Sequence, residues 1–355
     1  MNRRPEPPTN GDLAEALFAL SEREQPGERR LAFLHAAYTA FDAVEPAQRA
    51  ILDAAPSWLR PLVSQLVTCQ GRGALDAAVG RLSAGGQARR RQVRENFLAR
   101  RDAVSILENA REGLRPERMR GACHWHTRDS DGKATLETMA RTCQRRGLSW
   151  GLVTDHSRGL EVASGLDREG VRLQRRRVDR WNHRYGDDFR LFQGLEVEIL
   201  EDGTVDVSAP ERSEIECVVA AVHRDFDPDR DQTERLLRAI ASPDVRVLAH
   251  PRARHFHQRP GLRVRWEKVF AAALEHDVAV EINGFPRRQD LDPDLARLAA
   301  DAGCGFLLAS DAHAPAHLEF DGIACAIADL AGIEPAAILN ARQAEAFADW
   351  LIYGA

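Results

Sequence analysis

The feature that most constrains the fold is a series of seven short apolar segments, regularly separated by amphipathic stretches. The segments cover 119–124, 149–154, 189–198, 215–222, 245–249, 278–282 and 304–310. Helical spacing of apolar residues marks 135–147, 167–185, 231–241, 264–277, 292–303, 318–331 and 342–352. Strands that alternate with helices predict a parallel sheet with crossover helices. Over about 235 residues, we predict closure into a (β/α) barrel. An open, doubly wound sheet is the alternative, although no glycine-rich phosphate loop follows the first strand.

The first 110 residues have a different pattern, with helical periodicity and no strand signal. Apolar residues recur at helical spacing in 11–22, 29–43, 57–69 and 87–110, and Gly and Pro residues separate these segments. We therefore predict a small all-α domain over 1–115, followed by an α/β barrel domain over 116–355.

Composition excludes several classes of protein. No stretch of the 355 residues approaches 18 uninterrupted apolar residues, so we expect no membrane span. The first 16 residues contain no apolar core, so we expect no secretory signal. Six scattered cysteines without a C-x-x-C pair indicate reduced thiols, and we predict a cytoplasmic location.

Charge is distributed unevenly although the net charge is only −5. Residues 1–120 contain 19 arginines against 15 acidic residues, whereas residues 121–355 contain 30 basic and 39 acidic residues. Within the first part, residues 81–101 hold seven arginines and one glutamate. Such a segment can bind phosphates, and Arg89, Arg90 and Arg91 are its candidate contacts. The alternative is a solvated helix face.

Nearly every predicted strand ends in His, Asp or Glu. In chain order these polar residues are His124, His126, Asp131, Asp155, His156, Glu196, His223, His250, Glu281, Asn283, Asp311 and His313. In a parallel barrel the carboxyl ends of the strands meet on one face. Imidazole and carboxylate ligands suit Zn²⁺, Mn²⁺ or Fe²⁺. We therefore predict a site for two or three divalent metal ions, whose identity the residues leave open.

Several divalent ions in a water-accessible cleft favour phosphoester hydrolysis by a metal-bound hydroxide. Negative charge then has to be held by cations, and arginine binds phosphate in a bidentate way. We assign catalytic roles to Arg254, Arg259 and Asp155, and substrate binding to Arg252 and Arg287. For each arginine the alternative is a surface ion pair.

The motifs also occur in a recognisable order. H-x-H-T…SDG, TDHS, GLEVEI, AAVH, HP, EIN…P…R-x-DL and SDAH follow one another over about 117–345. In this order they resemble the PHP (polymerase and histidinol phosphatase) superfamily, most closely the PHP domain of bacterial family X DNA polymerases. No polymerase palm with its aspartates is seen. The resemblance implies a distorted (β/α)7 barrel with a trinuclear metal site.

The resemblance also implies which residues bind which ion. His124, His126, Glu196 and Asp311 would hold the first ion; Glu196, His223 and His250 the second; Asp131, His156 and His313 the third. The chain departs from the family pattern at Ala122-Cys123, where Asp-Leu is usual, and at Arg224, where Ser is frequent. The first departure affects the surroundings of the first ion, and the second affects substrate choice.

Three functions follow as hypotheses. The first is a metal-dependent phosphoesterase that processes nucleic-acid 3′ ends as a 3′–5′ exonuclease, with DNA or other nucleic acid as its partner. The second is a phosphatase for a small phosphomonoester such as histidinol phosphate or a nucleotide. The third is a non-catalytic module on the same scaffold. Residues 10–83 resemble the helix-hairpin-helix-bearing start of family X polymerases, which implies a DNA-binding region. The oligomeric state cannot be read from the sequence.

Overall fold

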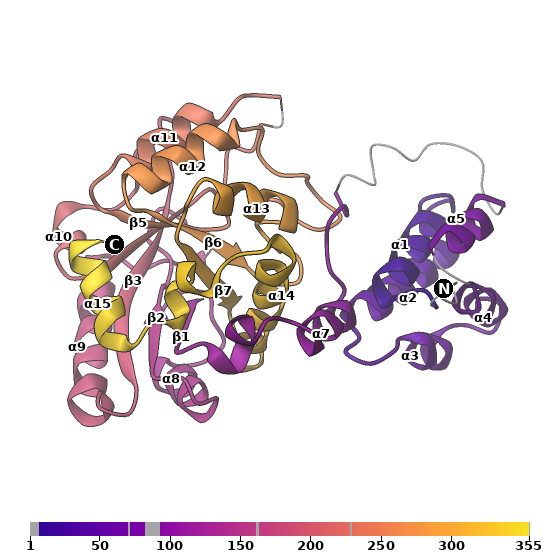
Figure 1. The fold of residues 1–355 in the computed structure, drawn as a ribbon, viewed down its shortest axis with the longest axis horizontal. Coiled ribbons are helices and arrows are strands. Elements are labelled where there is room, and N and C mark those ends of the chain that lie inside the picture. Colours follow the sequence, from indigo (N-terminus) through magenta and orange to yellow (C-terminus); the bar gives the residue numbers. More distant parts are fainter. Residues whose placement is uncertain (1–6, 70–71, 82–92, 161–162, 228, 355) are drawn as a thin grey trace. The chain divides into compact units, whose positions relative to one another are not determined.

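A computed structural model describes residues 7–69, 72–81, 93–160, 163–227 and 229–354. The predicted contacts Arg89, Arg90 and Arg91 lie outside these residues. The chain divides into two compact units (Figure 1). The first comprises Met1–Asn109 with Phe256–Gln258, and the second comprises Ala110–His255 with Arg259–Ala355.

The first unit is helical. Its described helices are α1 (Asn10–Ser21), α2 (Glu28–Asp42), α3 (Gln48–Ala54), α4 (Arg60–Val67), α5 (Arg72–Arg81) and α7 (Arg100–Glu108). Thr9 caps α1 and exchanges hydrogen bonds with Asp12 in a capping box. Leu17, Phe18 and Phe41 are buried in the core of this unit. The helices predicted over 11–22, 29–43 and 57–69 are confirmed, and α3 and α5 were not predicted.

The helix predicted over 87–110 is wrong over 93–99, because α7 begins only at Arg100, and its residues 87–92 lie outside the described residues. Asn96 has a φ of 58°, a left-handed conformation that an α-helix cannot contain. Arg94 turns inward instead, and its guanidinium forms ion pairs with Glu15 (2.8 Å) and with Glu22. Arg94 therefore does not belong to a solvated basic face.

The second unit is a closed barrel of seven parallel strands in the order of the chain. The strands are β1 (Gly121–Trp125), β2 (Trp150–Val153), β3 (Arg190–Glu198), β4 (Cys217–Ala221), β5 (Val245–Leu248), β6 (Ala279–Asn283) and β7 (Phe306–Ala312). Cys123 of β1 pairs with Ala309 of β7, and this pairing closes the barrel. The predicted (β/α)7 barrel is confirmed, and the open sheet is excluded.

Helices cover the outside of the strands (Figure 1). They are α8 (Leu136–Arg145), α9 (Arg168–Tyr185), α10 (Ala209–Arg212), α11 (Thr233–Ile240), α12 (Trp266–Glu275), α13 (Pro293–Asp301), α14 (Asp321–Ala331) and α15 (Ala344–Tyr353). Because helices cover the outer face while side chains fill the interior, the strands are buried on both faces and read as continuous apolar runs.

The apolar core fills the end of the barrel where the strands begin. Trp150, the first residue of β2, stacks on Phe347 of α15 with ring centroids 3.9 Å apart. Phe192 of β3 meets the edge of Phe347 at 5.2 Å, and all three rings are buried. Polar side chains are thereby left to the opposite end of the strands.

Candidate metal centre

The nine predicted metal ligands come together at the carboxyl ends of the strands. His124 lies within β1, Glu196 within β3 and Asp311 within β7, while the other six follow strands in short loops. Those six are His126, Asp131, His156, His223, His250 and His313. The convergence follows from the parallel order of the strands, because every strand ends on the same face of the barrel.

Glu196 lies at the centre of the group. Its Oε2 is 3.2 Å from Nε2 of His124 and 3.0 Å from Nδ1 of His156. Its Oε1 is 3.1 Å from Nε2 of His223 and 2.9 Å from Nε2 of His250. Each carboxylate oxygen therefore faces a different pair of imidazoles, which is the arrangement that a bridging carboxylate requires.

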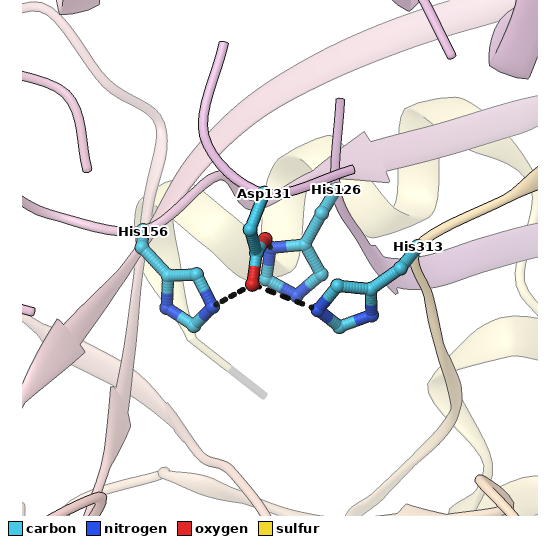
Figure 2. A group of neighbouring side chains, drawn as sticks. All are labelled: His126, Asp131, His156 and His313. Carbon is cyan, nitrogen blue, oxygen red and sulfur yellow. Dashed lines mark ion pairs between the residues drawn. The ribbon is translucent and has the colours of Figure 1, made fainter. Parts of the chain in front are cut away.

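The remaining carboxylates complete two further groups. Oδ1 of Asp311 lies 3.2 Å from Nε2 of His126. Figure 2 shows Asp131 between His156 and His313, whose Nε2 atoms lie 3.6 Å and 3.2 Å from its Oδ2. His126 approaches the same carboxylate at 3.8 Å. The groups overlap, so His126 and His156 each reach two of them.

Many of the buried polar atoms in this group lie close to one another but form no hydrogen bond among the described residues. They are Nε2 of His124, both ring nitrogens of His126, Nδ1 of His156, Oε2 of Glu196, Nε2 of His223 and Nδ1 of His250. Burying unpaired polar atoms is costly, and bound cations would satisfy them. Nitrogen and oxygen donors without thiolate fit zinc, manganese or iron.

Burial and neighbouring charges set the protonation of the imidazoles. Burial, followed by the neighbouring His156 ring, lowers the pKa of His126 to about 3. Burial and the Arg288 guanidinium lower the pKa of His250 to about 3 as well. These two rings are neutral at pH 7 and can donate lone pairs. Burial opposes protonation of His223 also, but the Glu196 carboxylate raises its pKa to about 9.

The carboxylates of the centre are held ionised. Burial alone would raise the pKa of Glu196, but the imidazoles around it hold that pKa well below its usual range. Asp311 is likewise buried, and Arg288 and His124 hold its pKa well below the ordinary value. Ionised carboxylates beside neutral imidazoles are the forms that bind divalent cations.

Two glutamates orient the histidines from behind. Oε2 of Glu281 lies 2.5 Å from Nδ1 of His124, and Oε2 of Glu198 lies 2.9 Å from Nδ1 of His223. A carboxylate on the second ring nitrogen fixes the tautomer and leaves Nε2 for a metal. Sequence reasoning named Glu281 without a role and missed Glu198. The signal for Glu198 is its spacing of two from Glu196, which places both side chains on one face of β3.

Three members of the centre adopt a left-handed backbone conformation. The φ angles are 54° for His124, 28° for His250 and 49° for Asp311. Non-glycine residues rarely occupy this region, and such strain is concentrated at functional sites. The left-handed backbone turns these three side chains toward the centre of the group, and the surrounding barrel holds the backbone in that conformation.

Asp155 is hydrogen-bonded to the loop that follows β1. Its carboxylate is buried and accepts hydrogen bonds from the backbone and hydroxyl of Thr127, from Ser130 and from Gln174. These contacts hold the loop that follows β1 and contains Asp131. The catalytic role that we assign to Asp155 stays a prediction.

The Arg254 side chain is enclosed by the fold. It is 2% exposed, and its Nε and Nη2 donate to the carbonyl of Gln289 at 2.9 Å and 2.6 Å. Asp292 lies 3.6 Å from its Nη1. Arg252 is also paired with Asp292. The guanidinium of Arg254 is thus paired inside the fold, and its predicted contact with a substrate phosphate stays a prediction.

Another arginine reaches the centre instead. Nε of Arg288 lies 2.8 Å from Oδ2 of Asp311, and 19% of the Arg288 side chain is exposed. From the sequence we assign substrate binding to Arg287 but no role to Arg288, the next residue. Arg259 donates its Nε to the carbonyl of Ala253 at 2.6 Å, and its guanidinium lies 3.7 Å from the centroid of the Phe226 ring. Arg287 is half-buried in the loop after β6.

Comparison with known proteins identifies the family. The chain is 31% identical over 243 residues to DNA polymerase/3′-5′ exonuclease PolX of Bacillus subtilis, a match covering 68% of this chain. A probable phosphatase of Caldicellulosiruptor saccharolyticus is 27% identical over 202 residues, and the Escherichia coli probable phosphatase YcdX is 26% identical over 202 residues. The descriptions of these relatives agree with the family that the sequence motifs resemble. The chain belongs to the PHP superfamily of phosphoesterases.

The extent of these matches differs. This PHP chain spans 41% of the length of the Bacillus protein but 78% of the Caldicellulosiruptor phosphatase and 77% of the Escherichia one. Among solved structures it resembles histidinol phosphate phosphatase of Lactococcus lactis in complex with zinc, L-histidinol and phosphate. That match has a TM-score of 0.42 at 14% identity, over 61% of this chain and 95% of the other.

No model of a protein family matches the chain. Within the described parts of the chain, no helix has both the length and the apolar character needed to cross a bilayer.

Proposed function

We propose that this PHP protein is a metal-dependent phosphoesterase that removes nucleotides from the 3′ ends of DNA. The observation on which this rests is the group of six imidazoles and three carboxylates around Glu196, of which six residues are buried. The 31% identity to a Bacillus protein described as a 3′-5′ exonuclease supports DNA as the substrate class.

The same residues support two or three divalent ions. Glu196 would bridge two of them, with His124, His126 and Asp311 on one side and His223 and His250 on the other. Asp131, His156 and His313 would hold the third. Bound divalent ions lower the pKa of water and stabilise charge on phosphoryl oxygens. Glu281 and Glu198 would hold the imidazoles in the tautomer that leaves Nε2 facing the ion.

Substrate charge requires cations at the same end of the barrel. Arg288 lies against Asp311, and burial lowers its pKa while the Asp311 carboxylate raises it, with a net increase. The guanidinium is therefore always charged and partly open to solvent. Arg288 is the residue that we propose for holding the phosphoryl group, with Arg259 and Arg287 as further contacts.

The helical unit would supply affinity for the DNA backbone. The segment 81–101 contains seven arginines, and Arg94, which is buried in ion pairs, is not a candidate contact. If this segment contacts phosphates, affinity for DNA falls as salt rises. A cytoplasmic location is part of the proposal, and all six cysteines are free thiols.

The test is an assay of purified protein with Mn²⁺ on 3′-labelled and 5′-labelled DNA, in single strands and duplexes. We expect 5′-labelled strands to shorten progressively. We expect 3′-labelled strands to release their label as mononucleotides. Glu196→Gln should abolish the activity, and Glu275→Gln, an exposed change on α12, should not. Intact DNA under all these conditions would refute the proposal.

A phosphatase for small phosphomonoesters is the second candidate. The observation in its favour is that the chain spans more than three quarters of the probable phosphatases it matches. A panel of histidinol phosphate and nucleotides, assayed beside the DNA, separates the two. Rapid phosphate release from one small ester while the DNA stays intact would establish this candidate instead.

A further inference from the structure

Three aromatic rings lie together beside His313 of the candidate metal centre. Phe285 follows β6, and His317 and Phe320 belong to η4 (Pro315–Phe320), which follows β7. The centroid of Phe285 is 6.4 Å from His313, 5.7 Å from His317 and 5.6 Å from Phe320. His317 and Phe320 stack on each other at 5.2 Å. We call Phe285, His317 and Phe320 the aromatic platform.

The platform is only partly covered by the fold. All three of its residues are half-buried, whereas the rings that fill the other end of the barrel, such as Trp150 and Phe347, are fully buried. Ring surface that is left open beside a site is surface on which a flat ligand can stack.

Hydrogen bonds tie the platform to the metal centre. The amide of Phe285 donates to Oδ1 of Asn283 at 2.9 Å. The Asn283 side chain in turn donates to Glu281 at 2.8 Å and to Asp311 at 3.4 Å. The amide of His313 donates to Nδ1 of His317 at 3.4 Å. The rings are thus fixed relative to the carboxylates and imidazoles that would hold the metal ions.

Close backbone packing also fixes the platform. A Cβ on Gly284 would collide with the carbonyl oxygen of Phe320, so the loop after β6 and the η4 turn pack directly on each other. This contact requires glycine and leaves little freedom for Phe285. A rigid ring costs less entropy when a ligand stacks on it.

A cation lies on the same rim. The amide of Lys133 donates to the carbonyl of His313 at 2.7 Å, and the Lys133 residue is exposed. An aromatic surface and a neighbouring cation together suit a base and a phosphate of the same strand.

We propose that the aromatic platform stacks the base of the nucleotide whose phosphoester lies at the metal centre. This inference rests on the proposed phosphoesterase function and narrows its substrate class to nucleotides and strand ends that retain a base. Stacking on aromatic side chains tolerates every base, because each has a π-face. The platform therefore selects for a nucleobase without selecting a sequence.

The first test reads stacking without catalysis. A single strand with 2-aminopurine as its 3′-terminal base is titrated with protein in the presence of a chelator, so that the DNA stays intact. We expect the fluorescence to be quenched on binding. Phe285→Leu, or Phe320→Leu if the first variant does not fold, should remove most of the quenching. Tyr353→Leu, which removes an exposed ring at the end of α15, should not. Equal quenching in all these proteins would overturn the inference.

The second test reads selectivity with metal present. Strands that end in a normal nucleotide are compared with strands that end in an abasic residue. We expect the wild type to prefer the base-bearing end by about tenfold in kcat/KM, as stacking energies suggest, and we expect Phe285→Leu to lose that preference. Equal rates on both ends in the wild type would exclude the platform as a base-binding surface.

The two proposals fail in distinguishable ways. If DNA ends stay intact but small esters are hydrolysed, the exonuclease proposal fails. The base-stacking proposal is then tested by comparing the hydrolysis of thymidine 5′-phosphate, which has a base, with that of ribose 5-phosphate, which has none, in the wild type and in Phe285→Leu. If no phosphoester is hydrolysed, the proposed function fails, and the fluorescence titration alone decides whether the platform binds a base.

Discussion

Replacing Glu281 by glutamine tests whether the residues behind the imidazoles set metal affinity. Oε2 of Glu281 meets Nδ1 of His124 at 2.5 Å. Oε1 accepts from the backbone amide of His250 at 3.2 Å and from the side chain of Asn283 at 2.8 Å. Glu281 is fully buried, so no water can replace a lost partner.

Glutamine has the shape of glutamate but only one accepting oxygen. With its oxygen toward His124, its NH₂ group would face the N–H donors of His250 and Asn283. With its NH₂ group toward His124, that ring would have to shift its proton to Nε2, the atom that faces Glu196. Either orientation disturbs the centre. Loss of such a contact typically weakens metal binding about 10–100-fold, or about 1.4–2.8 kcal/mol.

The assay is competition with a chromophoric chelator, which gives the metal Kd of the wild type and of Glu281→Gln. Glu275→Gln is the matched control, since Glu275 is exposed at the end of α12 and should leave the Kd unchanged. The thermal unfolding of all three proteins in chelator shows whether the variant is folded. A folded Glu281→Gln protein that binds metal as tightly as the wild type would refute the reasoning.

Three further predictions follow from the same geometry. Metal at a thousand times its Kd should stabilise the folded chain by about 4 kcal/mol and raise its Tm by roughly 8–16 °C. Calorimetry with and without chelator measures this shift, and an unchanged Tm would argue against a metal site. Arg288→Gln should raise KM for phosphoesters about 10–100-fold, as expected for a lost charged hydrogen bond, while Arg297→Gln, on the exposed side of α13, should not; equal KM values for all three proteins would remove Arg288 from the site. Phe347→Ala should destabilise the protein by about 3–5 kcal/mol in denaturant titrations, because the stacked contact with Trp150 is lost. The same variant should keep its metal affinity within about twofold of the wild type, and a large loss of affinity would show that the two ends of the barrel are coupled.

The barrel and its nine converging residues could be predicted because they depend on order along the chain. An apolar segment of five to ten residues that ends in a polar group is visible without knowing the fold. Parallel topology then fixes where the polar groups meet. The left-handed φ angles of His124 and Asp311 do not alter this outcome. They change the direction in which the side chains point, but the residues still lie at the carboxyl ends of their strands.

The arginines could not be sorted in the same way. Arg254 and Arg288 both follow a strand closely, and both precede a helix. One is buried against the carbonyl of Gln289 and the other reaches Asp311. The difference depends on which partner each long side chain finds across the loops, and no periodicity encodes that choice. The helix predicted over 87–110 is wrong over 93–99 for a similar reason, because the ion pairs of Arg94 outweigh local helix propensity.

The distribution of polar atoms over the two ends of the barrel explains why one end is suited to chemistry. At the end where the strands begin, Trp150, Phe192 and Phe347 pack on one another, and a change there alters stability. At the other end, Glu196 is surrounded by imidazoles whose second nitrogens are held by Glu198 and Glu281. Buried imidazole and carboxylate atoms without partners would destabilise the fold unless cations satisfy them. The residues that cost the metal-free chain stability are therefore the same residues that give it affinity for metal ions.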